Sequence, residues 1–273
     1  RGARQVQVAI GIEGAREAAR VRVEVGLDLE LGTKRIRFAI IGAGQLGSSL
    51  LEGLVRLGVE PSTIHAATRT PAHAEHLAEG FGVIPADAAS AAAQASSIII
   101  VSVRPDQVVN ALDEIHDQIQ PGAIVVSLAA NPDLATLAAH LPPGTPLVRV
   151  MPNPAMAVNA SLTGICPADD CPPAAVAKVR ALFSEFGSLV DVPESQIGLI
   201  GSLAGHGQAV VYYVADAMVQ WGVLEGFSRA QARTIVAGAI AGASKVLNET
   251  TASPNALQNR VTTPGGSTVK AMT

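Results

Sequence analysis

The strongest constraint on the fold is a glycine-rich turn that joins an apolar run to an amphipathic run, in RIRFAIIGAGQLGSSLLEGLVRLG. Gly42, Gly44 and Gly47 have the spacing G-x-G-x-x-G, and a strand before it and a helix after it are the context of a dinucleotide-binding turn. Gly42 permits the tight turn, Gly44 lets a pyrophosphate approach the backbone, and Gly47 allows close helix–strand packing. Gln45 and Leu46 begin the helix whose free N–H groups would face the phosphates. The alternative is a purely structural glycine turn.

Strands and helices alternate in the residues that follow. This βαβ pattern predicts a mostly parallel sheet and an α/β fold with a Rossmann-type NAD(P)-binding domain. The apolar runs place strands at 63–67, 82–85, 97–103, 123–128, 147–151, 162–166 and 188–192. Helices are expected at 71–80, 106–119, 133–140 and 173–186.

The pattern changes at both ends of this region. Within residues 1–33, apolar side chains alternate with others at 21–31 and, over a shorter stretch, at 6–12, which suggests an added strand pair of open role. After about residue 193 the strands stop, and two long helical stretches rich in Ala and Gly follow. We therefore expect an extension at 1–33, a dinucleotide-binding domain at 34–193 and an all-α domain for substrate binding and dimerisation at 194–273. Apolar helices without a sheet must bury their faces, so a homodimer or higher oligomer is expected.

The end of the second strand distinguishes between the two dinucleotides. NAD sites usually carry Asp or Glu there for the ribose hydroxyls, but here Thr68, Arg69 and Thr70 follow the strand. Arg69 can pair with a 2′-phosphate, which favours NADP over NAD. The alternative is a solvated arginine in a loop.

The fourth and fifth strands end in VSVRPDQV and VSLAANP. Ligands of an open α/β sheet bind at the carboxyl ends of the strands, so both segments should line the cofactor cleft. Arg104 either contacts phosphate or ribose or caps a helix end. The residues that we expect at the cofactor from these segments are Val103, Arg104, Pro105 and Ala129.

Composition argues against several other classes of protein. With 48% apolar and 15% charged residues, the 273-residue chain can bury a core. The net charge of −4 and the lack of a basic run argue against nucleic-acid binding. The apolar stretch 199–224 contains polar residues and lacks basic flanks, so we expect a buried helix and not a membrane span. Cys166 and Cys171 are too few for a zinc site, no metal is expected, and reduced thiols without a signal peptide predict a cytoplasmic protein.

Four segments occur in one order: the glycine turn, VSVRPDQV, RVMPNPA and VTTPGGST. Together they resemble the pyrroline-5-carboxylate reductase family over about residues 34–273, and the last segment is the most specific. The resemblance implies an NAD(P)-binding domain, a dimerising helical domain, and reduction of a cyclic imine to proline by hydride from the nicotinamide. It also implies Pro152 and Asn153 near the nicotinamide. The substrate-carboxylate cradle would comprise Thr263, Gly265, Gly266, Ser267 and Thr268.

The Pro-Gly-Gly turn is suited to such a cradle. Its glycines allow successive N–H groups to point into one concavity, and a helix beginning near Ser267 adds free N–H groups and its dipole. Hydroxyl groups flank the turn. The alternative is an ordinary helix start capped by Thr263 or Ser267. The resemblance implies further helices after Thr273, so we expect this domain to be truncated.

The chain departs from the family pattern around the imine site. Pro154 follows Asn153 where the family usually has Thr, and Thr251 stands where the family often has Glu. AGHGQAV at 204–210 replaces S-G-S-G-P-A-Y. In this segment His206 either donates a proton to the nascent amine or is a buried histidine satisfied by a backbone carbonyl. The departures leave two alternatives: an NADP-dependent reductase of another imine or a carbonyl, and an NADP-binding protein without catalysis.

Overall fold

The computed structural model describes residues 30–31, 34–86, 93 and 97–262. Contacts divide the chain into two compact units, residues 1–206 and 207–273. The expected strand pair at 1–33 falls mostly outside the described residues, which show a two-residue strand β1 (Glu30–Leu31) paired antiparallel with β2 (Lys34–Arg35). The predicted cradle residues, Thr263, Gly265, Gly266, Ser267 and Thr268, also lie outside the described residues.

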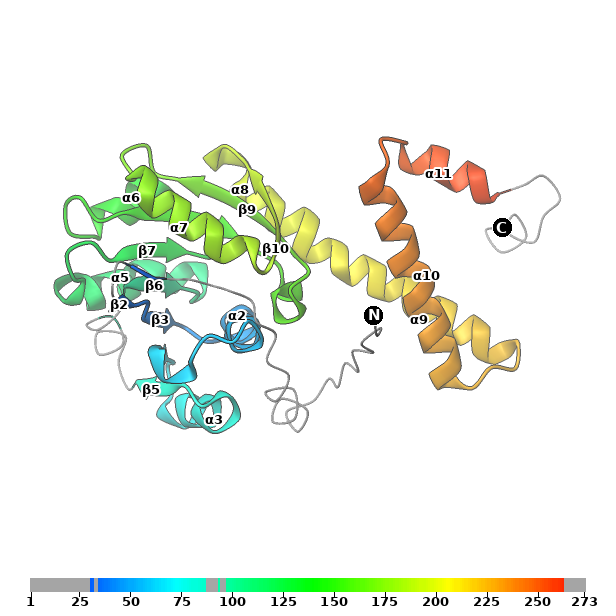
Figure 1. Cartoon of the computed structure of the whole chain (residues 1–273), viewed down its shortest axis with the longest axis horizontal. Helices are drawn as coiled ribbons and strands as arrows, with labels where there is room; N and C mark the ends of the chain where they lie inside the picture. Colours follow the sequence, from blue (N-terminus) through cyan, green and yellow to red (C-terminus); the bar gives the residue numbers. More distant parts are fainter. Residues whose placement is uncertain (1–29, 32–33, 87–92, 94–96, 263–273) are drawn as a thin grey trace. The chain divides into compact units, whose positions relative to one another are not determined.

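An eight-stranded sheet forms the centre of the first unit (Figure 1). Its order is β10-β9-β8-β7-β6-β3-β4-β5, and its neighbours are parallel except for the antiparallel pair β8–β9. The strand order reverses between β3 and β6, which is the switch point where open α/β sheets bind ligands. The mostly parallel sheet is confirmed, and the predicted strands differ from the observed ones by at most two residues at either end. The strands are β3 (Phe38–Ile41), β4 (Ile64–Ala67), β5 (Ile84–Ala86), β6 (Ile98–Val101), β7 (Ile124–Ser127), β8 (Leu147–Met151), β9 (Ser161–Pro167) and β10 (Gly187–Asp191).

Helices cover both faces of this sheet, because alternate strand residues point to opposite sides. Phe38, Ile40 and their neighbours pack with α2 (Gln45–Arg56), α3 (Pro71–Phe81) and α7 (Pro173–Ser184). Ala39 and Ile41 point the other way, toward α5 (Val108–Ile115) and α6 (Leu134–Ala139). The central strands are buried on both faces, which explains their continuous apolar runs.

The prediction of one continuous helix at 106–119 is wrong, because the structure divides this segment into an α-helix between two 3₁₀ turns. A 3₁₀ turn η2 (Pro105–Gln107) precedes α5, and a second one, η3 (His116–Gln118), follows it. Pro105 has no N–H to give and fits the first position of such a turn. Three further short elements complete the unit: η1 (Pro61–Thr63), η4 (Pro154–Val158) and α8 (Glu194–Ile200), the last followed by a π-helical turn η5 (Gly201–His206).

The second unit is helical within its described residues, as predicted. Helix α9 (Gly207–Leu224) packs on α10 (Arg229–Glu249) through Val219, Ala232 and Val236, and α11 (Pro254–Val261) follows. Ser228 caps the N-terminus of α10 with a reciprocal capping box. Contacts assign α8 and η5 to the first unit, whereas the predicted domain boundary at 193 falls before α8. That boundary stays a prediction.

Candidate dinucleotide and substrate site

The glycine turn lies between β3 and α2, at the switch point of the sheet. Gly42 has φ +89°, a conformation that other L-residues rarely adopt. A Cβ atom there would lie 2.4 Å from Cγ1 of Val103, which follows β6. The Gly42 N–H donates to Ala67 O at 2.8 Å, and the Ser102 hydroxyl donates to Gly42 O. Three strand ends therefore hold this turn in one conformation.

The start of α2 is open for a ligand. Gly44 occupies the N-cap position without a side-chain cap, and a Cβ atom there would meet nothing within 4 Å. Gln45 beside it is exposed, whereas Leu46 packs against the core. Gly47, unlike Gly44, has no room for a side chain, because a Cβ atom there would lie 2.6 Å from Gly42 O. A helix N-terminus with uncapped N–H groups and room above Gly44 fits a pyrophosphate.

The end of β4 provides a cation and no carboxylate. Thr68 donates its hydroxyl to Thr70 O at 2.8 Å, which shapes the loop between β4 and α3. Arg69 between them is exposed and has no ion pair or hydrogen bond with the residues that the structure describes. Its guanidinium is therefore available for an anionic ligand on the β4 side of the glycine turn.

The ends of β6 and β7 place the other predicted cofactor residues. Arg104 is exposed and pairs with Asp106 at 3.4 Å, and its side chain makes no cap on η2, which begins at Pro105. Arg104 is thus an ion-pairing surface residue in this conformation. Ala129 follows β7 and is buried, and its N–H donates to Ser127 Oγ at 3.3 Å.

The segment after β8 is tied down on several sides. The Asn153 side chain is buried, accepts from the Ala155 N–H at 3.2 Å, and donates from Nδ2 to Ala204 O at 3.2 Å. Pro152 before it is also buried. Asn153 thereby caps η4 and attaches the segment to the π-helical turn η5. The turn η4 also packs on α2, where a Cβ at Gly53 would lie 2.7 Å from Met156 O.

His206 is the last residue of η5 and is exposed in the single chain. The single chain does not bury its imidazole. Its neighbour Ala204 is fixed by Asn153, so η5 is anchored beside the carboxyl end of β8. The π-helical turn widens the backbone locally, a feature that is frequent at functional sites.

Two family models match the chain. "NADP oxidoreductase coenzyme F420-dependent" matches residues 37–131, and "Pyrroline-5-carboxylate reductase dimerisation" matches residues 194–273. Among curated proteins, the pyrroline-5-carboxylate reductase of Escherichia coli K12 is 35% identical over 240 residues, which are 88% of each chain. That of Methanosarcina acetivorans is 33% identical and covers 86% of this chain and 88% of the relative.

The chain belongs to the pyrroline-5-carboxylate reductase family. Solved structures of the family have the same fold. Pyrroline carboxylate reductase of Plasmodium falciparum, with NADP bound, has a TM-score of 0.78 at 20% identity, covering 88% of this chain and 89% of that one. The reductase of Streptococcus pyogenes has a TM-score of 0.76 at 24% identity, covering 87% and 89%. The predicted fold, a Rossmann-type domain followed by a helical dimerisation domain, is confirmed.

In this member of the reductase family, the sequence did not predict the polar side chains that hydrogen-bond to the loops at the carboxyl ends of the strands. Arg149 lies within β8 and is 2% exposed, and it pairs with Glu194 at the start of α8. Ser102, which holds the glycine turn, was not singled out either. A charged residue inside the apolar run LVRVM was the available signal for Arg149. Its partner, 45 residues away, had no signal in the sequence.

Two further properties of the described residues concern metals and membranes. They contain no group of three or more His, Cys, Asp or Glu side chains that could hold a metal ion. Among the same residues, no helix combines the length and hydropathy needed to span a membrane.

Proposed function

We propose that this chain reduces 1-pyrroline-5-carboxylate to L-proline with NADPH as the hydride donor. The observation that carries this function is the open glycine turn and α2 N-terminus in a chain of this reductase family. Beside them lies Arg69, which has no ion pair with the residues that the structure describes. The chain is an NAD(P)H-dependent oxidoreductase that acts on a CH–NH bond, and proline biosynthesis is the pathway that follows from this activity.

The fit to NADP rests on the geometry of the site. Gly44 leaves room for the pyrophosphate, and the uncapped start of α2 supplies N–H donors. Arg69, with the Thr70 hydroxyl beside it, would hold the 2′-phosphate. When bound, the nicotinamide supplies the hydride that reduces the imine carbon. The protein's part is to orient both reactants and to stabilise charge.

The substrate carboxylate would bind in the Pro-Gly-Gly segment, on the N–H groups around Gly265 and Gly266 and on the hydroxyls of Thr263, Ser267 and Thr268. This assignment rests on the sequence. An iminium ion accepts hydride more readily than a neutral imine, and a small cyclic imine can take its proton from solvent. A strong general acid is therefore not required. His206, exposed on the anchored η5 turn, is the proposed proton donor where one is used.

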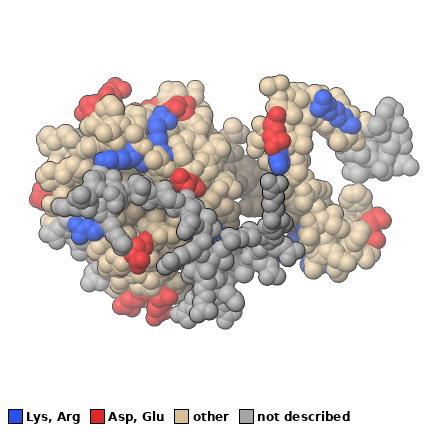
Figure 2. Space-filling model, in the orientation of Figure 1, with Lys and Arg blue, Asp and Glu red and all other residues tan. Residues whose placement is uncertain are grey.

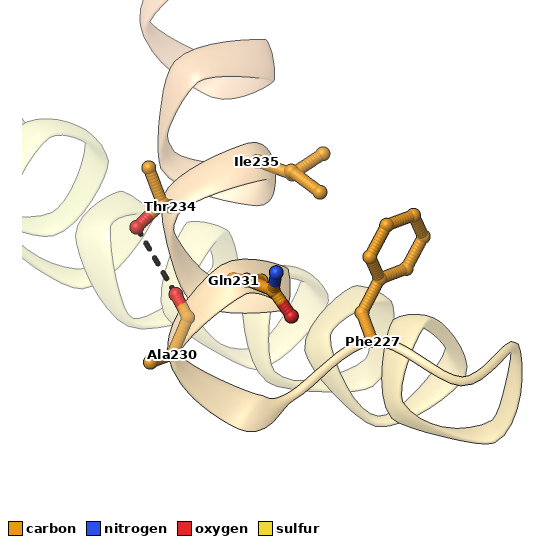
Figure 3. A pocket seen from close by; sticks show the side chains of 5 residues that line it. All are labelled: Phe227, Ala230, Gln231, Thr234 and Ile235. Carbon is orange, nitrogen blue, oxygen red and sulfur yellow. Dashed lines mark hydrogen bonds between the residues drawn. The ribbon is translucent and has the colours of Figure 1, made fainter.

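The helical unit is proposed to form a homodimer. Helix α9 has eighteen residues, of which Val219 is the buried one, and Leu224 is 85% exposed. The visible face of this unit is mostly uncharged in Figure 2. Phe227 and Ile235 flank an open hollow of about 350 Å³ at the start of α10 (Figure 3). Exposed apolar area of this kind marks a protein interface. The apolar side chains on this unit include Val210, Tyr213, Trp221, Leu224, Phe227 and Ile235.

The dimer is tested by size-exclusion chromatography with light scattering. Tyr213→Glu and Leu224→Glu each place a charge on the apolar face and are expected to give monomers. Ala72→Glu, which adds the same single negative charge at an exposed position of α3, is the control and should stay dimeric. A wild-type monomer at micromolar concentration would contradict the proposal. The unpaired thiols Cys166 and Cys171 agree with a cytoplasmic enzyme, which we also propose.

The activity is tested by following NADPH absorbance with 1-pyrroline-5-carboxylate, beside other cyclic imines and ketones. We expect turnover with pyrroline-5-carboxylate and a lower kcat/KM with NADH. Preference for a ketone would favour the carbonyl-reductase alternative, and tight NADPH binding without any turnover would favour a non-catalytic protein. Thr268→Val should raise the KM for the imine and leave the dissociation constant of NADPH unchanged. A His206→Ala variant with wild-type kcat across the pH range would remove His206 from the mechanism.

A further inference from the structure

Arg149 is a buried cation that the reduction chemistry does not use. It lies in β8 between apolar neighbours, and its Nη1 donates to Glu194 Oε1 at 2.7 Å. Its Nη2 donates to Ala130 O at 2.6 Å and, with a longer contact of 3.4 Å, to Ala129 O. Glu194 Oε1 also accepts the N–H of Leu134, the first residue of α6. One guanidinium thus joins β8, the loop after β7 and the start of α8.

Stability alone is a weak reason for this arrangement. Burying a guanidinium costs several kcal/mol by desolvation, and an ion pair repays that cost only with complete hydrogen bonding. Here Arg149 Nε is buried and has no hydrogen-bond partner within the described residues. Glu194 keeps 35% of its side chain exposed. The contacts that are well made are those to the Ala130 carbonyl and to Glu194.

The position of those carbonyls points to a function. In a trans peptide the C=O and the following N–H point in opposite directions. Because Arg149 holds the Ala129 and Ala130 carbonyls, the N–H groups of Ala130 and Asn131 are directed away from Arg149. Neither N–H has a hydrogen-bond partner among the residues that the structure describes. Ala130 is half-buried and Asn131 is exposed.

The loop after β7 belongs to the second half of the sheet, beyond the switch point. A Rossmann sheet binds one mononucleotide on each half. Arg69 at β4 marks the half that takes the adenosine 2′-phosphate, so β6–β8 is the half for the nicotinamide. We infer that Arg149, held by Glu194, is a positioning residue that turns the Ala130 and Asn131 N–H groups toward the nicotinamide half of NADP. This inference rests on the proposed cofactor.

The test compares two ligands that share the adenosine half. Calorimetry would give dissociation constants for NADPH and for adenosine 2′,5′-bisphosphate, which lacks the nicotinamide. Arg149→Lys keeps the charge but cannot bridge Glu194 and both carbonyls. We expect it to weaken NADPH binding at least about 10-fold and to change adenosine 2′,5′-bisphosphate binding less than about 2-fold. Glu194→Gln should act in the same direction with a smaller effect.

Arg180→Lys is the matched control. Arg180 donates to Asp191 at 3.2 Å and forms an arginine–carboxylate pair like that of Arg149, but on the surface. Its substitution should leave the dissociation constants of both ligands unchanged. A folded Arg149→Lys that binds NADPH as tightly as the wild type, or that loses both ligands equally, would overturn the positioning role. If that variant does not fold, the same comparison with Glu194→Gln decides. A wild-type protein that does not bind NADPH would instead refute the proposed function.

Discussion

The glycine turn allows cofactor binding and folding stability to be separated with two alanine substitutions three residues apart. At Gly44 the backbone is extended, with φ −71° and ψ −158°, and an added Cβ meets nothing within 4 Å. Alanine therefore fits the apo protein, and we expect the free energy of unfolding to change by less than about 0.5 kcal/mol. The new methyl group occupies the space through which a pyrophosphate would reach the backbone. We expect NADPH affinity to fall about 10- to 100-fold, which is about 1.4–2.8 kcal/mol.

At Gly47 we expect alanine to lower the free energy of unfolding as well as the affinity for NADPH. A Cβ there would lie 2.6 Å from Gly42 O and 2.7 Å from Ser102 Oγ, so the turn or the helix must move. Overpacking of this kind costs about 1–3 kcal/mol, and each kcal/mol lowers the melting temperature by about 2–4 °C in a protein of this size. Affinity should then fall because the turn is displaced.

Urea unfolding without ligand and calorimetric titration with NADPH measure the two quantities separately. Gly44→Ala should lose affinity and keep stability, and Gly47→Ala should lose stability. Gly44→Ala with wild-type affinity would refute the placement of the pyrophosphate. Equal loss of stability in both variants would refute the local geometry.

Three further predictions concern other parts of the first unit. Arg69→Gln should raise the KM for NADPH about 10- to 100-fold with little change for NADH; an equal effect on both coenzymes would remove the 2′-phosphate role. Gly53→Ala should cost about 1–3 kcal/mol in urea unfolding because its Cβ clashes with η4, whereas Gly80→Ala on α3, with no atom within 4 Å, should stabilise by up to about 1 kcal/mol. Asp133 caps α6, and its hydrogen bonds with Thr136 lower the carboxyl pKa, so its stabilisation is present above the ordinary carboxyl pKa and is lost as pH falls through the lowered one. The stability difference between wild type and Asp133→Ala should therefore shrink on acidification, and a difference independent of pH would contradict the cap.

Much of the Rossmann architecture follows from local sequence patterns. Continuous apolar runs such as Ile98–Val101 require burial on both faces, and runs of that length separated by amphipathic helices have few solutions other than a parallel sheet. The glycine spacing at Gly42, Gly44 and Gly47 identified the turn, because each position needs a small side chain for a local reason. The missing carboxylate after β4 indicated NADP by the same kind of local chemistry.

The supporting polar contacts were not predictable in this way. The partner of Arg149 is Glu194, and that of Asn153 is the carbonyl of Ala204, 51 residues along the chain. Helix propensity, capping and hydrophobic period are properties of neighbouring residues, and they say nothing about which distant side chains meet.

By itself, the sequence determined the order of strands and helices, the glycine turn and the preference for NADP, because these depend on residue type and short-range spacing. The tertiary structure decided the contacts that hold the site in place. They are the hydrogen bonds of Arg149 to the Ala129 and Ala130 carbonyls, the bond from Asn153 to η5, and the packing of η4 on α2. These contacts join strand ends that only the folded sheet brings together. A buried charge in β8 can be read from the sequence as unusual, but its purpose depends on the carbonyls that the fold places within its reach.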